Sequence, residues 1–154
     1  MKTVTAITAA GLVSFGLGFA TPAAAYHLIP ENATFTGKGN TSATKNGITL
    51  KCKANFQGHV DSQGVGFVDS GTFTGELGCT AVGLGGLPWK SVAKSATKVL
   101  INNVSFTSPI GNCGPGKVPV KVVDGTIKFT NVNLAGGCTI SGKIATTPAL
   151  SIVP

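Results

Sequence analysis

The segment GNCGPGKV, residues 111–118, comes closer than any other stretch of this chain to a known chemical motif. Its glycine, four residues and Gly-Lys match all but the last position of the phosphate-binding loop G-x-x-x-x-G-K-[ST]. That loop requires a helix after it, whereas KVPVKVV predicts a strand, and Val118 replaces the hydroxyl that would hold magnesium. The sequence therefore predicts a turn that carries Cys113, with Gly114 and Gly116 in unusual backbone conformations, and no nucleotide site.

The titratable side chains give little support to a catalytic or metal site. The chain has five acidic residues and two histidines, and no G-x-S-x-G segment marks a nucleophile. His27 and Glu31 lie near one end of the sequence. His59 lies on the polar face of a predicted strand, and Asp61 follows it in a predicted turn. No two cysteines have the spacing of paired metal ligands, and neither histidine adds one. We predict no catalytic residue, no metal and no cofactor.

The cysteines predict two disulfide bonds, as is usual for exported chains of this size. The four residues Cys52, Cys79, Cys113 and Cys138 allow three pairings. We prefer Cys52 with Cys79 and Cys113 with Cys138, because each pair lies in neighbouring predicted strand segments.

The first 25 residues have the features of a secretory signal peptide. Lys2 precedes an apolar run from Val4 to Ala20, and Ala23-Ala24-Ala25 fits the small-residue cleavage pattern. Cleavage would leave residues 26–154 as one domain with no transmembrane anchor. We expect a secreted or cell-surface protein, with the periplasm as an alternative destination.

Alternating apolar and polar residues predict strands through most of residues 26–154. The clearest is Ile48–Val60, in which Ile48, Leu50, Cys52, Ala54, Phe56 and Val60 share one face. A second strand over 66–82 would place Phe67, Phe73, Leu77 and Cys79 on its apolar face. Further strands are predicted over 98–106, 117–123, 126–134 and 138–146. Asp124-Gly125 indicates a hairpin, and the Asn-Val pairs at 103–104 and 131–132 indicate bulges.

These elements predict an all-β fold, an antiparallel β-sandwich or Greek-key barrel of about 7–8 strands with two disulfides. Residues 26–46 match no motif and are interpreted as a mobile or donated N-terminal segment. Residues 83–96 are interpreted as a loop, with one helical turn as an alternative from Ser91. In that loop, Leu87 and Trp89 either plug one end of the fold or form a surface contact.

Every basic residue except the histidines is a lysine, and the formal net charge is +7. Arginine, which reads guanine edges and phosphates with a planar fork, does not occur, so specific nucleic-acid recognition is not expected. The lysines are scattered along the sequence. They are interpreted as a solvated surface, with loose attraction to anionic lipopolysaccharide, polysaccharide or DNA as the alternative.

Several segments in order resemble one bacterial family: LKCKANFQGHV, SGTFTGELGC, GLPW, GNCGPGKV and AGGCTISGKIATTPAL. Their order and spacing are similar to those of the alkane oxidation protein activators, the Pra proteins of pseudomonads and relatives. The resemblance covers about residues 50–150. It implies a secreted, non-enzymatic accessory protein associated with growth on hydrocarbons, which emulsifies or wets the substrate or acts at the cell surface or in biofilm.

Three functional hypotheses follow. The first is a surface-active or adhesive protein that contacts hydrocarbon, lipid or polysaccharide surfaces and that can self-associate. The second is a structural subunit of an extracellular fibre or surface layer, assembled through exposed strand edges. The third, which the few acidic residues disfavour, is a secreted hydrolase.

Overall fold

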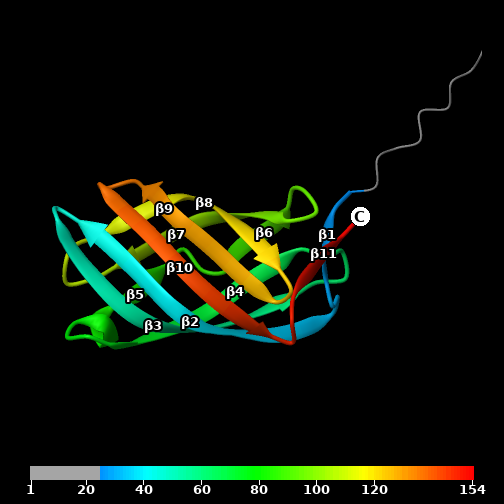
Figure 1. Cartoon of the computed structure of the whole chain (residues 1–154), viewed down its shortest axis with the longest axis horizontal. Helices are drawn as coiled ribbons and strands as arrows, with labels where there is room; N and C mark the ends of the chain where they lie inside the picture. The colour runs from blue at the N-terminus through cyan, green and yellow to red at the C-terminus, as the bar shows by residue number, and fades with distance from the viewer. Residues whose placement is uncertain (1–24) are drawn as a thin grey trace, which may run out of the picture.

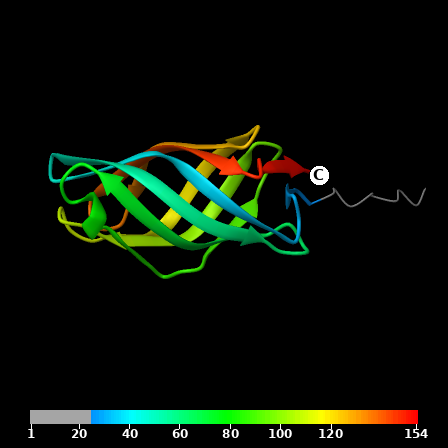
Figure 2. The same cartoon turned by 90° about the horizontal axis from the view of Figure 1, so that it is seen from below.

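Eight antiparallel strands close into a barrel in residues 25–154, the part of the chain that the computed structural model describes (Figures 1 and 2). The wall consists of β2 (Ala33–Lys45), β3 (Ile48–Val60), β4 (Gly66–Gly75), β6 (Trp89–Ala93), β7 (Lys98–Thr107), β8 (Cys113–Val123), β9 (Thr126–Leu134) and β10 (Cys138–Thr147). Each strand pairs with its neighbours in the chain, and β10 pairs with β2 to complete the ring. The predicted all-β fold is confirmed as a barrel, and its connections run up and down rather than as a Greek key.

An additional short strand lies in the same wall. β5 (Gly83–Gly85) pairs with the last part of β7, and β6 pairs with the first part, so β5 and β6 form one interrupted strand. The predicted loop over 83–96 is therefore largely strand. The sequence did not predict these strands, because the glycines and the proline of this segment interrupt the alternation that is typical of a strand.

Side chains alternate between the barrel interior and solvent, as the period of two predicts. In β3, Leu50, Cys52, Ala54 and Val60 are buried, which confirms that face of the predicted strand. Ile48 is the exception, because it belongs to the β2–β3 hairpin at the barrel end and is 59% exposed.

A bulge in β4 corrects the predicted face of the second strand. Gln57 pairs with Ser70 while the next residue, Gly58, pairs with Val68, so Asp69 is an extra residue. An extra residue reverses the alternation, so Val68 points inward and Phe67 lies outside against His59. The strand also ends at Gly75, and Leu77 is fully exposed.

The two predicted Asn-Val bulges are confirmed. Asn103 and Asn131 have φ angles of 58° and 49°, and both lie where the strand register shifts. Asparagine is enriched among the non-glycine residues that adopt this left-handed conformation. The Asp124-Gly125 hairpin is present as well, with φ angles of 47° and 75°.

The N-terminal segment is part of the barrel, contrary to the expectation of a mobile or donated strand. β2 pairs with β3 along its whole length and with β10 along its other edge. β1 (His27–Ile29) pairs instead with β11 (Ser151–Val153), and this two-stranded sheet lies at one end of the barrel (Figure 1). The predicted signal peptide falls almost wholly on residues 1–24, which lie outside the described residues.

The two predicted disulfides are confirmed at the opposite end. Cys52 bonds to Cys79 and Cys113 bonds to Cys138, with Cα–Cα distances of 5.6 and 5.7 Å. Cys79 belongs not to a strand, as predicted, but to the short 3₁₀ helix η1 (Cys79–Ala81).

Candidate functional site

A cavity of about 140 Å³ occupies the barrel interior. Side chains from opposite sides of the barrel line it, among them Phe35, Phe56, Val122, Phe129 and Ile144. Among the residues that the structure describes, no charged side chain faces this space. An apolar space of this kind removes hydrocarbon surface from water and offers no strong polar partner.

An aromatic cluster forms the middle of the interior. Phe56 packs edge-to-face against Phe73, with ring centroids 5.7 Å apart, and lies 6.4 Å from the ring of Trp89. Trp89 is 6% exposed, and its indole Nε1–H donates a hydrogen bond of 2.7 Å to the Gly85 carbonyl oxygen. The indole thus presents its apolar rings to the cavity while its one polar group is satisfied.

The position of Trp89 matches neither of the two interpretations given for it, the end plug or the surface contact. It belongs to β6 and fills the barrel interior, and it does not plug an end of the fold. Leu87, two residues earlier, is 36% exposed and remains available at the surface.

The polar groups of the cavity are hydroxyls. They belong to Thr41, Ser91 and Ser108, of which Ser91 is buried. Ser42 and Ser141 pair in register on the same face as Lys51, so their hydroxyls point outward. No buried side-chain nitrogen or oxygen among the described residues lacks a hydrogen-bond partner. The Thr41 hydroxyl donates to the Cys52 carbonyl oxygen at 3.2 Å, and the Ser108 hydroxyl donates to the Gly111 carbonyl oxygen at 2.9 Å.

One side of the barrel wall is closed by side chains instead of backbone hydrogen bonds. The β4–β6 pairing ends at Val68 and Trp89, and β5 pairs with β7 but not with β4. Leu84 covers the space between β4 and β5: a Cβ on Gly71 would lie 2.7 Å from both Leu84 Cδ1 and Phe56 Cδ1. Gly71 is therefore needed for these side chains to close the wall.

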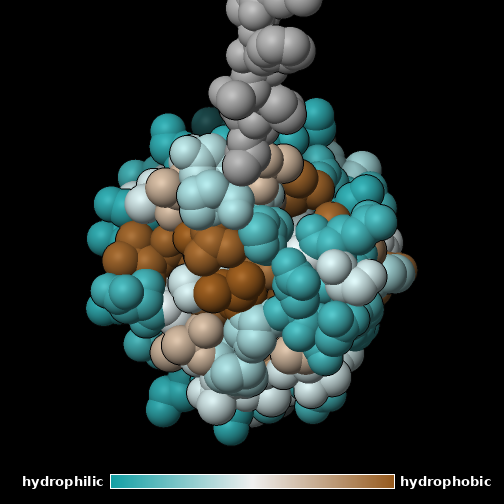
Figure 3. Space-filling view, turned by 90° about the vertical axis from the view of Figure 1, so that its right-hand side faces the viewer, coloured by the Kyte–Doolittle hydropathy of each residue, from teal (hydrophilic) through white to brown (hydrophobic). Residues whose placement is uncertain are grey.

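The end of the barrel that lies beside residue 25 and the C-terminus, called the terminal end below, is closed by β1 and β11. Leu28 and Leu150, each 3% exposed, line the cavity from this end. Around them lie the partly or fully exposed apolar residues Tyr26, Ile29, Val123, Ile152 and Val153. Figure 3 looks onto this end and shows apolar side chains grouped near its centre, with hydrophilic ones around them.

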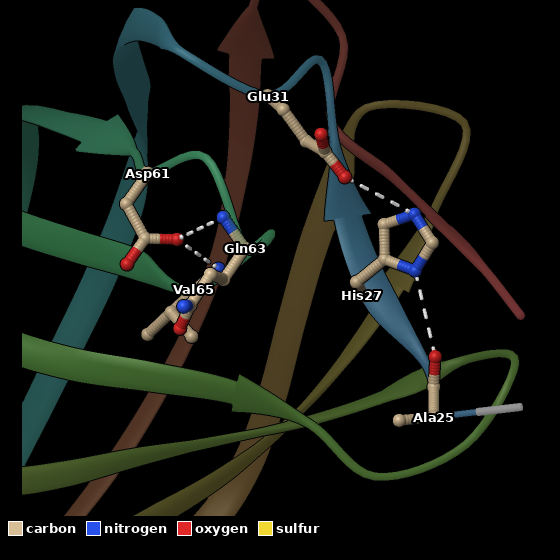
Figure 4. Close-up of polar contacts among 6 residues, drawn as sticks. All are labelled: Ala25, His27, Glu31, Asp61, Gln63 and Val65. Atoms are coloured by element: carbon tan, nitrogen blue, oxygen red, sulfur yellow. Dashed lines mark hydrogen bonds and ion pairs between the residues drawn. The ribbon is translucent and has the colours of Figure 1, made fainter.

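A polar turn holds β1 in place (Figure 4). The Asp61 Oδ1 atom accepts hydrogen bonds of 2.9 Å from the backbone N–H groups of Gln63 and Val65. The Leu28 N–H in turn donates to the Gly64 carbonyl oxygen at 2.9 Å. Nearby, His27 Nε2 lies 3.3 Å from Glu31 Oε1, a contact made within the β1 segment itself.

The residues that suggested other chemistry are dispersed. Cys113 opens β8, and the strand continues to Val123, so no helix follows the glycine-rich segment and a phosphate loop is not formed. Gly114 has the expected positive φ, 85°, but Gly116 does not. His59 Nδ1 lies 2.7 Å from Asp69 Oδ2 on the outer surface, away from the cavity.

A comparison with protein families identifies the family of this chain. The family model described as "Alkane oxidation protein activator PraA/PraB-like" matches residues 1–154. The chain belongs to this family. Searches of the curated proteins and of the solved structures each found no match.

Membership of the PraA/PraB-like family extends the resemblance seen in the sequence. The match includes residues 26–46, which contain β1 and β2 and which no sequence motif had covered. The word activator in the family description indicates an accessory role. The described residues contain neither a helix with the length and apolar character to cross a membrane nor a cluster of potential metal ligands.

Proposed function

We propose that this protein is an exported, non-enzymatic accessory protein that takes up small apolar molecules, hydrocarbons among them, into its barrel. The apolar cavity of about 140 Å³ is the observation that carries the proposal. The family description, which concerns alkane oxidation, supports a hydrocarbon ligand. Two disulfides support export, because such bonds form in oxidising compartments, with the medium, the cell surface and the periplasm as destinations.

The volume sets the size of the ligand. An engineered apolar cavity of about 150 Å³ stays dry and binds benzene, so the space here suits about six carbon atoms. Burial of a methylene group contributes about 0.8 kcal/mol, or about 5 kcal/mol for such a ligand before its immobilisation is subtracted. Binding is then expected at submillimolar concentrations or weaker. A longer chain would have to extend past Leu28 and Leu150 at the terminal end.

Two neighbouring residues of β8 provide a matched test. Val122 is 3% exposed and lines the cavity, whereas Val123 points outward and is 42% exposed. We expect hexane to cause saturable chemical-shift changes in the wild-type protein and in Val123→Phe. Val122→Phe should lose them, because its ring occupies the cavity. Since overpacking can destabilise a core, Val122→Ile serves as a smaller second variant with partial loss.

The proposal fails if hexane causes no saturable change in the folded wild-type protein, or if Val122→Phe binds hexane as the wild type does. Xenon, which occupies apolar cavities, gives an independent probe of the same space. A xenon response that is lost in Val122→Phe and kept in Val123→Phe would support the cavity as the site.

A surface-active or adhesive function is the second candidate, and two side chains favour it. Leu77 is fully exposed and Ile48 is 59% exposed, both at the disulfide end of the barrel. Exposed apolar side chains can enter an oil–water interface without any rearrangement of the fold. Replacing both with serine should abolish any lowering of oil–water interfacial tension. Unchanged interfacial activity in that variant would remove this candidate.

The fibre-subunit hypothesis loses its expected donor strand, because β2 is already paired on both edges. Closure of the barrel also leaves few strand edges for assembly. Self-association remains a prediction to be tested by the sedimentation of the purified protein.

A further inference from the structure

Lysines from four consecutive strands form a single row on the outside of the barrel. Lys98 of β7 pairs in register with Lys121 of β8, Lys121 with Lys128 of β9, and Lys128 with Lys143 of β10. All four side chains are exposed. Directly opposite residues on adjacent strands are the closest neighbours in a sheet, so positive charges follow one another at about 4.8 Å per strand.

The row continues beyond these four strands. On one side, Lys143 pairs with Asn40 of β2, and Asn40 pairs with the exposed Lys53 of β3. On the other side, the backbone N–H of Lys94 donates to the Lys98 carbonyl oxygen at 2.8 Å. We call this set the lysine row: Lys94, Lys98, Lys121, Lys128, Lys143 and Lys53.

No acidic side chain neutralises the lysine row within the protein. In residues 25–154 the recorded ion pairs are His27–Glu31 and His59–Asp69, and neither includes a lysine. The acid nearest in sequence to the centre of the row is Asp124, in the turn of the β8–β9 hairpin. Like charges placed directly opposite destabilise a sheet, so the row opposes folding unless an outside anion compensates it.

A shallow hollow of about 530 Å³ adjoins the lysine row on the outer face of β10, β2, β3 and β4. Lys53 belongs to both features, and Asn40, the register partner of Lys143 and Lys53, also lines the hollow. The rest of the hollow includes the hydroxyl groups of Ser42 and Ser141, which share the outer face with Lys51. It also includes the carboxylate of Glu76, which accepts a hydrogen bond from the Lys51 backbone N–H. Amide and hydroxyl groups beside cations suit a ligand that carries both hydroxyls and negative charges.

We propose that the lysine row and this hollow bind a linear acidic polysaccharide, of the polyuronate type with one carboxylate on each sugar. The carboxylates would follow the regularly spaced ammonium groups, and sugar hydroxyls would hydrogen-bond in the hollow. Lysine acts as a point charge, so charge and spacing decide the match without a bidentate geometry. The site lies outside the barrel and is independent of the apolar cavity.

Other polyanions fit this surface less well. Single-stranded nucleic acids are held by aromatic side chains on which bases stack, and the hollow contains no aromatic residue. Binding to an anionic bilayer is strengthened by apolar side chains that enter the interface, and the partners within the lysine row are lysines and an asparagine. Duplex DNA and anionic vesicles therefore enter the test as competitors.

Two charge-matched double variants test the proposal, each made in the chain that begins at residue 26 after the predicted cleavage. Lys121→Gln with Lys128→Gln removes the centre of the row. Lys90→Gln with Lys117→Gln removes the same charge at exposed positions where neither residue is the register partner of a lysine. Binding to immobilised polygalacturonate is measured for both, with dextran as the neutral polymer.

The row variant should bind polygalacturonate at least about tenfold more weakly than the wild type. In the control variant, the decrease in the logarithm of the affinity should be less than half as large. The wild-type affinity should fall as sodium chloride is raised, a measurement that needs no variant. Because the row variant removes repulsion, its melting temperature should be equal to or above that of the wild type.

Three results would overturn the proposal. The first is wild-type binding to polygalacturonate no stronger than to dextran. The second is an equal loss in the two double variants, which would show attraction by net charge alone. The third is row-dependent binding of phosphatidylglycerol vesicles or duplex DNA that equals or exceeds binding of the polyuronate.

Discussion

At one end of the barrel, one disulfide joins η1 to β3 and the other joins two wall strands. At the other end, the closure consists of two three-residue strands, β1 and β11, and the leucines beside them. Cys113 and Cys138, each 1% exposed, bridge the starts of β8 and β10 at the first end. Leu28 and Leu150 are buried to a similar degree at the second end, but only packing and hydrogen bonds hold them.

The difference indicates which end can open. Separation of the loops at the disulfide end is limited by covalent bonds, whereas β1 and β11 can separate by breaking a few backbone hydrogen bonds. A ligand that reaches the interior cavity is therefore expected to pass the terminal end. Three substitutions test this contrast, in order of their expected effect on stability.

Removal of the Cys113–Cys138 disulfide should have the largest effect. For a sequence separation of 25, the loop-entropy estimate gives a loss of about 3 kcal/mol in the free energy of unfolding for the double alanine variant. Urea denaturation without reductant measures it, and the same change at Cys52–Cys79, with a separation of 27, should have a similar effect. A loss below about 1 kcal/mol in both would show that the disulfides do not distinguish the two ends.

Leu28→Ala should lower the free energy of unfolding by about 2 kcal/mol, at the low end for a buried leucine because the terminal strand can relax. It should also accelerate the exchange of hexane between the cavity and solvent, measured by NMR line shape. Leu134→Ala is the matched control, since Leu134 is 5% exposed and ends β9 at the disulfide end. Equal acceleration in both variants would contradict ligand passage at the terminal end.

Asp61→Ala should have the smallest effect, about 1 kcal/mol, because it removes one carboxylate oxygen that accepts two backbone hydrogen bonds in a surface turn. That turn supplies the Gly64 carbonyl oxygen to the Leu28 N–H, so amide hydrogen exchange at Leu28 should become faster. Asp69→Ala, on the outer surface beside His59, should leave the Leu28 amide unchanged. Unaltered protection in Asp61→Ala would mean that the turn does not hold β1.

Local sequence signals were sufficient for much of the fold. The bounds of Ile48–Val60 and of residues 126–134 were predicted as the structure has them, because apolar and polar residues alternate in both, with a single shift at the Asn131 bulge in the second. The hairpin at Asp124-Gly125 and the asparagine bulges were predictable because a few residues determine those backbone conformations. Both disulfide pairs followed from the strand segments that carry the cysteines.

Features that depend on pairing between distant strands were missed. The Asp69 bulge, which turns Phe67 outward, is defined by the register of β4 against β3 and not by any residue pattern within β4. β5 and β6 were taken for a loop because only their pairing with β7 makes the glycine-rich segment extended. The position of Trp89 in the barrel interior was missed for the same reason, since it lies in this segment.

The sequence by itself determined that this chain is all-β, bears two disulfides, carries an excess of lysine and resembles the alkane oxidation protein activators. Those properties depend on composition, short-range alternation and motif spacing. Only the tertiary structure decided that the barrel encloses an apolar cavity, since a cavity is the volume left after distant side chains pack. It also decided that Lys98, Lys121, Lys128 and Lys143, dispersed along the sequence, form one row, because strand register is set by the pairing of the whole sheet.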